Sequence, residues 1–202
     1  MDRSNRVVLM VAGLLAVTTL AFADTAKDYA ERVASLIDPA KLATLAERGA
    51  NPRVQKYVAQ LAEARAEQLN VSNIVVVAVA RVGMKGEAAT LTRDAMLRNL
   101  TIADRLGCLD TEGLKEMRQG KAATVKRGPY KGQELSVDHI IPFAIVPELD
   151  KVIANLELMP ERVNKSKGYN VGERQLDLGW QLQKAGLLSK SGLKALKEKK
   201  KS

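Results

Sequence analysis

The chain has 202 residues, of which 46% are hydrophobic, 27% charged and 3% aromatic. This composition is typical of a globular protein and excludes disorder throughout, while so few aromatic rings argue against a protein that stacks the bases of single strands. The single cysteine, Cys108, excludes an intramolecular disulfide and a multi-cysteine zinc site, and any imidazole chemistry must use the single histidine, His139.

The net charge of +9 is concentrated toward the C-terminus. Residues 115–202 hold 18 basic and 10 acidic residues, whereas residues 24–114 hold 12 of each. A basic region of this kind favours a polyanionic partner, either nucleic acid or an anionic membrane surface. A solvated basic face is the alternative interpretation.

Residues 1–23 have the pattern of a secretory signal peptide. Arg3 and Arg6 precede an apolar stretch over residues 7–23 that ends in Ala-Phe-Ala. The pattern predicts cleavage after Ala23 and export to the periplasm or the medium, with no stable membrane association after cleavage. The alternative is an uncleaved anchor helix, for which the 17 apolar residues are at the lower limit.

Residues 24–120 are predicted to form a helical scaffold. Asp38-Pro39 and Asn51-Pro52 are both typical of a helix start, with a capping residue followed by proline. The apolar run over residues 74–80 fits either a buried strand or a core helix, because periodicity does not separate the two. The spacing of apolar residues predicts helices over residues 25–37, 39–49, 51–70, 92–106 and 111–118.

The residues that can carry chemistry follow a turn-rich segment at residues 128–132. The alternation over residues 134–139 predicts a strand that ends at Asp138 and His139. Residues 155–160 predict a second strand, and Pro160 suits the start of a helix over residues 161–167 that ends at Gly168. The predicted order is therefore strand, loop, strand and helix.

This arrangement suits metal-assisted hydrolysis of phosphodiester bonds. Mg²⁺ prefers oxygen ligands and keeps several waters, so one carboxylate from Asp138 and one amide oxygen from Asn164 are a sufficient protein contribution. Imidazole titrates near neutral pH, so His139 can accept a proton from an attacking water. The metal ion would neutralise the phosphate and the leaving oxygen.

Three segments in this order resemble the HNH nuclease motif: Asp138-His139-Ile140-Ile141-Pro142, Asn155-Leu156 and Asn164-Lys165-Ser166-Lys167-Gly168. In that family the fold is a ββα-metal unit and the activity is metal-dependent cleavage of DNA or RNA. The resemblance, which covers roughly residues 125–170, implies that His139 is the general base and that Asp138 and Asn164 bind the metal. It also implies that Asn155 braces the catalytic loop and that Lys167 contacts phosphate.

Further phosphate contacts are predicted for Arg162 and Lys165, because both lie beside the expected metal ligand on the same helix. Two departures from the family pattern change what we expect of the bound metal ions. Residues 159–162 stand where many family members have a Cys-x-x-Cys pair, so we expect no structural zinc and predict that packing against the preceding helices braces the motif. The last ligand is Asn164 in place of histidine, which favours Mg²⁺ or Mn²⁺ over zinc.

The remaining C-terminal residues are predicted to complete the packing. A helix through residues 172–182 would cover the ββα unit with Trp180 as an anchor. The predicted fold class is α+β and predominantly helical, with a C-terminal ββα-metal unit packed against an N-terminal helical region. The predicted organisation is a signal peptide (1–23), a helical scaffold (24–120), an HNH domain with its following helix (121–188) and a basic tail (189–202).

The sequence thus predicts an exported Mg²⁺-dependent endonuclease of low sequence specificity, acting on DNA in preference to RNA. Low specificity is expected because basic side chains contact the phosphate backbone and carry no sequence information. A non-catalytic nucleic-acid-binding protein on a decayed HNH scaffold is one alternative. The others are an envelope-associated structural protein with an uncut N-terminal helix, and a toxin that an immunity protein neutralises.

Overall fold

The computed structural model describes residues 24–201, and the predicted signal sequence at residues 1–23 lies outside them. The fold is α+β and predominantly helical, with one antiparallel sheet of two strands in the described part of the chain. Residues 24–37 are helical. The elements that follow are α2 (Pro39–Ala43), α3 (Asn51–Ala66), α4 (Val71–Arg81), α5 (Gly86–Arg105), α6 (Thr111–Arg118), β1 (Leu135–His139), η1 (Pro147–Leu149), η2 (Ile153–Asn155), β2 (Leu156–Pro160), α7 (Glu161–Lys167), α8 (Glu173–Lys184) and α9 (Lys190–Lys201).

The two predicted Asx-Pro helix starts behave differently. The Asp38 side chain caps α2 by accepting a hydrogen bond from the Ala40 main-chain nitrogen at 3.0 Å, as predicted. Asn51 does not cap α3, because the N-cap position falls on Ala50 and no side chain bonds there. Both helices are also shorter than predicted, since α2 ends at residue 43 and α3 at residue 66.

The ambiguous apolar run at residues 74–80 is helical and forms most of α4. Asn70 caps this helix by accepting a hydrogen bond from the Asn73 main-chain nitrogen. Its buried residues recur at helical spacing, while Val76 stays exposed. The buried set is Ile74, Val75, Ala78 and Val79. The packing of α4 against α5 therefore outweighs the strand preference of its β-branched residues.

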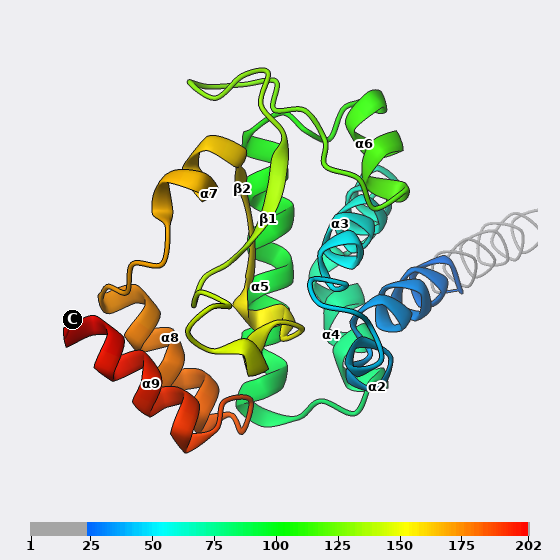
Figure 1. Cartoon of the computed structure of the whole chain (residues 1–202). Helices are drawn as coiled ribbons and strands as arrows, with labels where there is room; N and C mark the ends of the chain where they lie inside the picture. The colour runs from blue at the N-terminus through cyan, green and yellow to red at the C-terminus, as the bar shows by residue number, and fades with distance from the viewer. Residues whose placement is uncertain (1–23, 202) are drawn as a thin grey trace, which may run out of the picture.

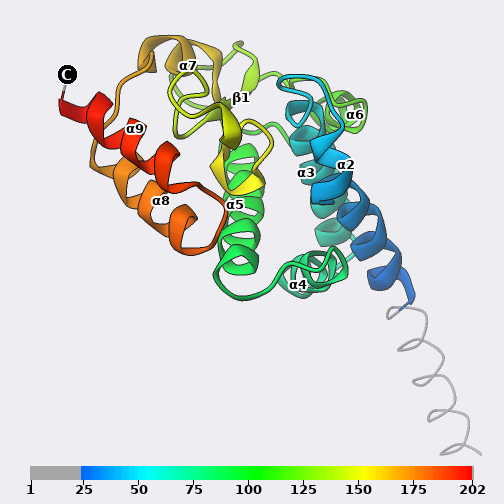
Figure 2. The same ribbon diagram turned by 60° about the horizontal axis from the view of Figure 1, so that its bottom comes forward.

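Helix α5 is the central element of the fold. In Figures 1 and 2 it runs between α2, α3, α4 and α6 on one side and α8 and α9 on the other, and the sheet lies against it. It begins at Gly86, six residues before the predicted start at Thr92. None of the helices within residues 24–201 is both long and apolar enough to cross a membrane.

Strands β1 and β2 form the predicted antiparallel pair, and α7 follows β2 directly. Asp138 lies opposite Glu157, and His139 lies opposite Leu156. Because successive strand residues point to opposite faces, Asp138 and His139 leave the sheet on different sides. The predicted order of strand, loop, strand and helix is therefore confirmed, and the two chemistry-bearing residues are the last two of β1.

Buried amides join the helices to the main chain of the sheet. Gln55 on α3 donates a hydrogen bond to the Leu135 carbonyl at 2.7 Å. Asn99 on α5 donates to the Leu156 carbonyl at 3.0 Å and accepts from the Leu158 nitrogen at 2.9 Å. Both strands thus depend on hydrogen bonds from upstream helices as well as on each other.

Two hydrophobic cores hold the elements together. The larger one joins the helices up to α6 with the apolar side chains of β1 and β2. The smaller one lies between the β1–β2 loop and the helices α8 and α9. Its buried members are Ile141, Val146, Leu149, Ala154, Leu182, Leu188, Leu193 and Leu196. The loop that follows His139 is therefore packed, and does not extend into solvent.

The C-terminal region differs from the predicted tail and from the predicted packing of Trp180. Residues 190–201 form α9, whose Leu193 and Leu196 are buried against α8. Gly179 permits this close approach, because a Cβ there would lie 2.6 Å from Leu196 Cδ2. Gly179 and Leu182 occupy the inward face of α8, so Trp180 points outward. Trp180 is 51% exposed, and the Lys197 ammonium lies 3.7 Å from the centroid of its ring.

Candidate active site

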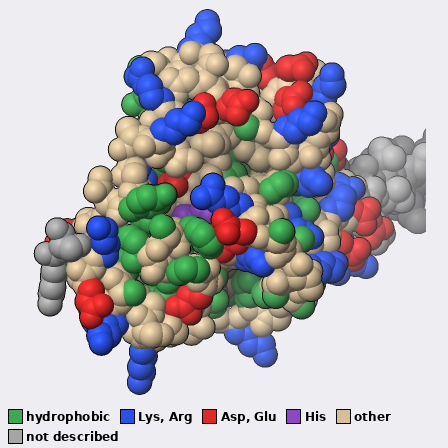
Figure 3. All heavy atoms as spheres, viewed as in Figure 1, with side chains coloured by type: hydrophobic (Ala, Val, Ile, Leu, Met, Phe, Trp, Pro, Cys, Tyr) green, Lys and Arg blue, Asp and Glu red, His purple; other side chains and the backbone are tan. Residues whose placement is uncertain are grey.

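A cleft of about 250 Å³ opens beside the end of β1. Four of the residues predicted from the sequence line it: Asp138, His139, Asn164 and Lys165. Figure 3 shows the histidine side chain in a hollow of the surface, with basic and acidic side chains next to it. The fold therefore brings together the carboxylate, the imidazole and one carboxamide from β1 and α7.

The His139 imidazole is held by one nitrogen. The residue is 7% exposed, and its Nε2 lies 3.1 Å from both the main-chain oxygen and Oδ1 of Asp150. A carbonyl oxygen can only accept, so Nε2 carries the proton in the neutral ring and Nδ1 carries the lone pair. Nδ1 makes no hydrogen bond to any residue in the described range 24–201, and the Phe143 ring packs at 6.0 Å between centroids.

Asp150 contacts the His139 ring and was not predicted from the sequence. Its buried carboxylate accepts hydrogen bonds from the Arg48 main-chain nitrogen at 3.0 and 3.2 Å, as well as facing His139. Arg48 adopts a left-handed backbone with φ of 57° in the loop between α2 and α3. No spacing rule in the sequence pairs Asp150 with His139. The Asp150 carboxylate is held in place by Arg48, which lies 102 residues upstream.

Asn155 lies beneath the cleft and does not line it. Its fully buried side chain accepts from the Ile141 nitrogen at 2.8 Å and donates to the Ile141 carbonyl at 3.1 Å. The Asn155 carbonyl also accepts from the Ile140 nitrogen at 2.8 Å. These bonds fix the main chain directly after His139, which is where the predicted bracing role requires them.

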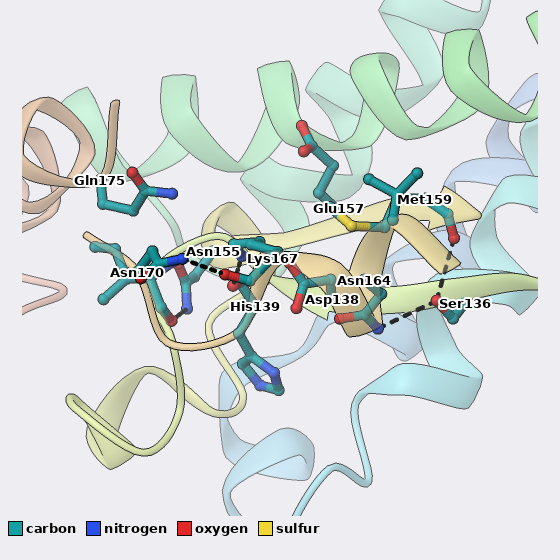
Figure 4. Close-up of polar contacts among 12 residues, drawn as sticks. Ser136, Asp138, His139, Asn155, Glu157, Met159, Asn164, Lys167, Asn170 and Gln175 are labelled. Carbon is teal, nitrogen blue, oxygen red and sulfur yellow. Dashed lines mark hydrogen bonds and ion pairs between the residues drawn. The ribbon is translucent and has the colours of Figure 1, made fainter. Parts of the chain in front are cut away.

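Asp138 and Asn164 present oxygen atoms suited to a hard cation. The Asn164 amide nitrogen donates to Ser136 Oγ at 3.2 Å, and Figure 4 shows its oxygen turned toward Asp138. A carboxylate and an amide oxygen beside a cleft with room for water match the ligands that Mg²⁺ and Mn²⁺ prefer. Within residues 24–201, no group of three His, Cys, Asp or Glu side chains could hold a metal ion.

Lys167 points into the site and not into solvent. Its ammonium contacts Asp138 Oδ2 and lies 2.5 Å from the main-chain oxygen of His139. The side chains of Lys167 and Asp138 are 18% and 14% exposed. Figure 4 shows this group between the strand and α7, while the His139 ring points away from it.

The other basic residues predicted on α7 lie in different places. Lys165 lines the cleft, is exposed, and pairs with Glu161 one turn earlier at 2.6 Å. Arg162 lies outside the cleft lining, with its guanidinium 5.5 Å from the centroid of the Tyr130 ring.

Two exposed residues that were not predicted, Arg48 and Tyr169, complete the rim of the cleft. Tyr169 directly follows Gly168, the residue after α7, so its position beside the motif could have indicated that it lies at the cleft. Arg48 lies far upstream in the sequence, and its position gave no such indication.

A second acid, Glu157, lies opposite Asp138 on β2 and was also missed. It is buried, and its Oε1 lies 3.0 Å from Arg98 Nε and 2.5 Å from an Arg174 terminal nitrogen. The ion pair with Glu157 raises the pKa of Arg174. Two guanidinium groups therefore compensate Glu157, and Asp138 pairs with Lys167 instead.

The candidate site thus combines residues of β1, the β1–β2 loop and α7 with Arg48 from the N-terminal half. A scan against models of protein families, a search of curated proteins and a search of solved structures each found no match to this chain. Function is therefore inferred from the geometry of the cleft and from the chemistry of the residues that line it.

Proposed function

We propose that this protein is an exported, metal-dependent endonuclease that hydrolyses phosphodiester bonds in nucleic acid, with DNA as the preferred substrate. The observation that carries the proposal is one cleft lined by Asp138, His139 and Asn164, in which the imidazole is anchored by one nitrogen. The excess of basic residues in the same half of the chain supports a polyanionic substrate.

His139 acts as the general base. The main-chain oxygen of Asp150 keeps the proton on Nε2, so the lone pair of Nδ1 is available to take a proton from a water beside the scissile phosphate. The Asp150 carboxylate orients the ring and stabilises the imidazolium that forms. Asn155 keeps the main chain after His139 in place, so the ring does not need to be ordered at each turnover.

Asp138 and Asn164 would hold Mg²⁺ or Mn²⁺, which supplies neutralisation of the phosphate and of the leaving oxygen when bound. Lys165 and Arg48 at the rim attract the phosphates on either side of the scissile bond. Such contacts reach the backbone of the nucleic acid and not the base edges, so cleavage is expected to show little sequence preference.

Digestion of supercoiled plasmid by the purified protein tests the proposal. We expect nicking with Mg²⁺ or Mn²⁺, none with chelator, and none with His139→Ala or Asp138→Asn. Asp177→Asn is the matched control, because it makes the same change at an exposed carboxylate on α8 that does not line the cleft. That variant should nick plasmid at the wild-type rate.

Two results would contradict the proposal. Plasmid and RNA that both stay intact in every lane, with salt-sensitive binding retained, would support the alternative of a non-catalytic nucleic-acid-binding protein. Nicking that persists in both His139→Ala and Asp138→Asn would exclude this cleft as the site of hydrolysis.

Export is the second part of the proposal, and it rests on the pattern of residues 1–23. Fractionation of the producing cells followed by N-terminal sequencing tests it. A chain that begins at Asp24 in the periplasm or the medium is the expected result. A chain that keeps residue 1 and stays with the membrane fraction would contradict it.

A further inference from the structure

We propose that Lys167 is a built-in counter-ion, which occupies the cation position on Asp138 and is displaced when a divalent metal ion binds. This inference rests on the proposed function, because it takes Asp138 as a metal ligand. It differs from the phosphate contact that the sequence pattern implies for Lys167. The ammonium is found on the acid of the site and not at the rim.

The position of the ammonium resembles that of a bound cation. Lys167 Nζ is held by two oxygens, one from the Asp138 carboxylate and one from the His139 carbonyl. Carboxylate and carbonyl oxygens are also the ligands that Mg²⁺ and Mn²⁺ prefer. Two cations on the same carboxylate oxygen repel each other, so a divalent ion that takes Asp138 Oδ2 would displace the Lys167 ammonium.

Charge compensation explains why the ammonium is there. Asp138 is mostly buried, and a buried carboxylate is strongly disfavoured unless it is paired. Glu157 lies directly opposite on β2, but Arg98 and Arg174 already pair with it. Within the described residues, Lys167 is therefore the cation that pairs with Asp138 directly, and the Arg174 guanidinium adds a second, longer-range positive charge.

The location of Lys167 allows it to leave without a change in fold. It is the last residue of α7, it is followed by Gly168, and its four-carbon side chain can turn toward the cleft, which Asn164, Lys165 and Gly168 line. A phosphate bound in the cleft would attract the released ammonium. Metal loading and phosphate binding are thereby coupled, because the same charge moves from the acid to the substrate.

Binding of Mn²⁺ alone to the full-length protein, measured by isothermal titration calorimetry, tests the competition. Lys167→Met keeps the length of the side chain and removes its charge, so we expect Mn²⁺ to bind roughly tenfold more tightly than in wild type. Lys165→Met removes a positive charge from the same helix but does not contact Asp138, so Mn²⁺ affinity should stay at the wild-type value. This control separates direct competition from a general change in potential.

Acetylation of lysine amines, read by mass spectrometry, gives a second measurement that does not depend on a variant. Without metal, Lys167 should react slowly because its ammonium is paired and mostly buried. Saturating Mn²⁺ should accelerate its acetylation by at least roughly threefold, whereas exposed Lys165 should react at the same rate in both conditions.

The outcomes separate this inference from the proposed function. Equal Mn²⁺ affinity in wild type and Lys167→Met, with binding lost in Asp138→Asn, would overturn the role of Lys167 and leave the metal site at Asp138 intact. Mn²⁺ binding that leaves Lys167 acetylation unchanged would also overturn it. Absence of Mn²⁺ binding in every variant would contradict the metal site and the inference together. Lys167→Gln serves in place of Lys167→Met if circular dichroism shows that the latter is unfolded.

Discussion

His139 Nε2 lies 3.1 Å from both the main-chain oxygen and a carboxylate oxygen of Asp150. The carboxylate is in turn fixed by the main-chain nitrogen of Arg48, so the N-terminal half of the chain sets the orientation of the imidazole. The main-chain contact selects the tautomer, and the carboxylate adds orientation and charge. The two contributions can therefore be separated by changing the side chain alone.

Asp150→Asn should lower kcat for plasmid cleavage by about 10- to 100-fold with KM unchanged, because the ring loses its charged partner but keeps its main-chain acceptor. The affinity for Mn²⁺ should not change, since Asp150 does not contact Asp138. Steady-state cleavage kinetics and calorimetry measure both. Glu148→Gln is the control, because it makes the equivalent change at an exposed acid of the same loop. A wild-type kcat in Asp150→Asn would contradict the positioning role.

Asn155→Ala should lower the free energy of unfolding by about 2–4 kcal/mol, because it leaves a buried N–H and a buried carbonyl of Ile141 without partners. Urea denaturation followed by circular dichroism measures this value. Asn170→Ala removes one exposed hydrogen bond to the Lys167 carbonyl and should cost less than about 0.5 kcal/mol. Equal costs for the two variants would show that Ile141 is not held as described.

Asn99→Leu should cost about 3 kcal/mol, because the buried amide bonds to the main chain of β2 and to the Tyr57 hydroxyl at 2.7 Å. Leucine has a similar shape but satisfies none of these groups. A double-mutant cycle with Tyr57→Phe should show a coupling of roughly 1 kcal/mol, since the hydroxyl and the amide bond to each other. Strictly additive costs would argue against that hydrogen bond.

The protein should lose stability above about pH 9. Burial raises the pKa of Cys108 from 9.0 to about 11, so the folded state keeps a proton that the unfolded chain releases. The resulting stabilisation is complete below pH 9 and is lost as the pH rises to about 11. Burial likewise raises the pKa of Tyr29 from 10.0 to about 12, which extends the loss to higher pH.

Urea denaturation between pH 8 and pH 11 measures this dependence. Wild type should lose about 1–2 kcal/mol of unfolding free energy more than Cys108→Ala over the interval from pH 9 to pH 11. The variant is expected to be less stable than wild type at pH 8, because the buried sulfur no longer fills its place in the core. Parallel curves for the two proteins would contradict the assignment to Cys108.

The strand, loop, strand and helix could be predicted because each has a local signal in the sequence. Alternation marks β1, Pro160 ends β2 where α7 begins, and Gly168, with φ of 57°, follows the end of that helix. Asp138, His139 and Asn164 come together because these local signals place them at the end of a strand and on the adjacent helix.

The parts that could not be predicted depend on contacts between distant segments. Asp150 and Arg48 meet only after the helices pack, so no spacing in the sequence indicates their role. The β-branched run at residues 74–80 is helical because its neighbours are helices, and its composition favoured a strand. Trp180 is exposed because a glycine and a leucine occupy the inward face of α8. The general tendency of large aromatic residues to be buried therefore predicted the wrong position for it.

The hydrogen bonds from Gln55 and Asn99 to the sheet limit the transfer of this site to another protein. A two-stranded sheet is marginal in water on its own. Here a main-chain carbonyl of each strand accepts a hydrogen bond from a side-chain amide of an upstream helix, and the loop between the strands is packed under α8 and α9. The strand, loop, strand and helix that carry the candidate site therefore do not form an independent folding unit. Grafting residues 130–168 onto another scaffold would require these helices to be rebuilt as well.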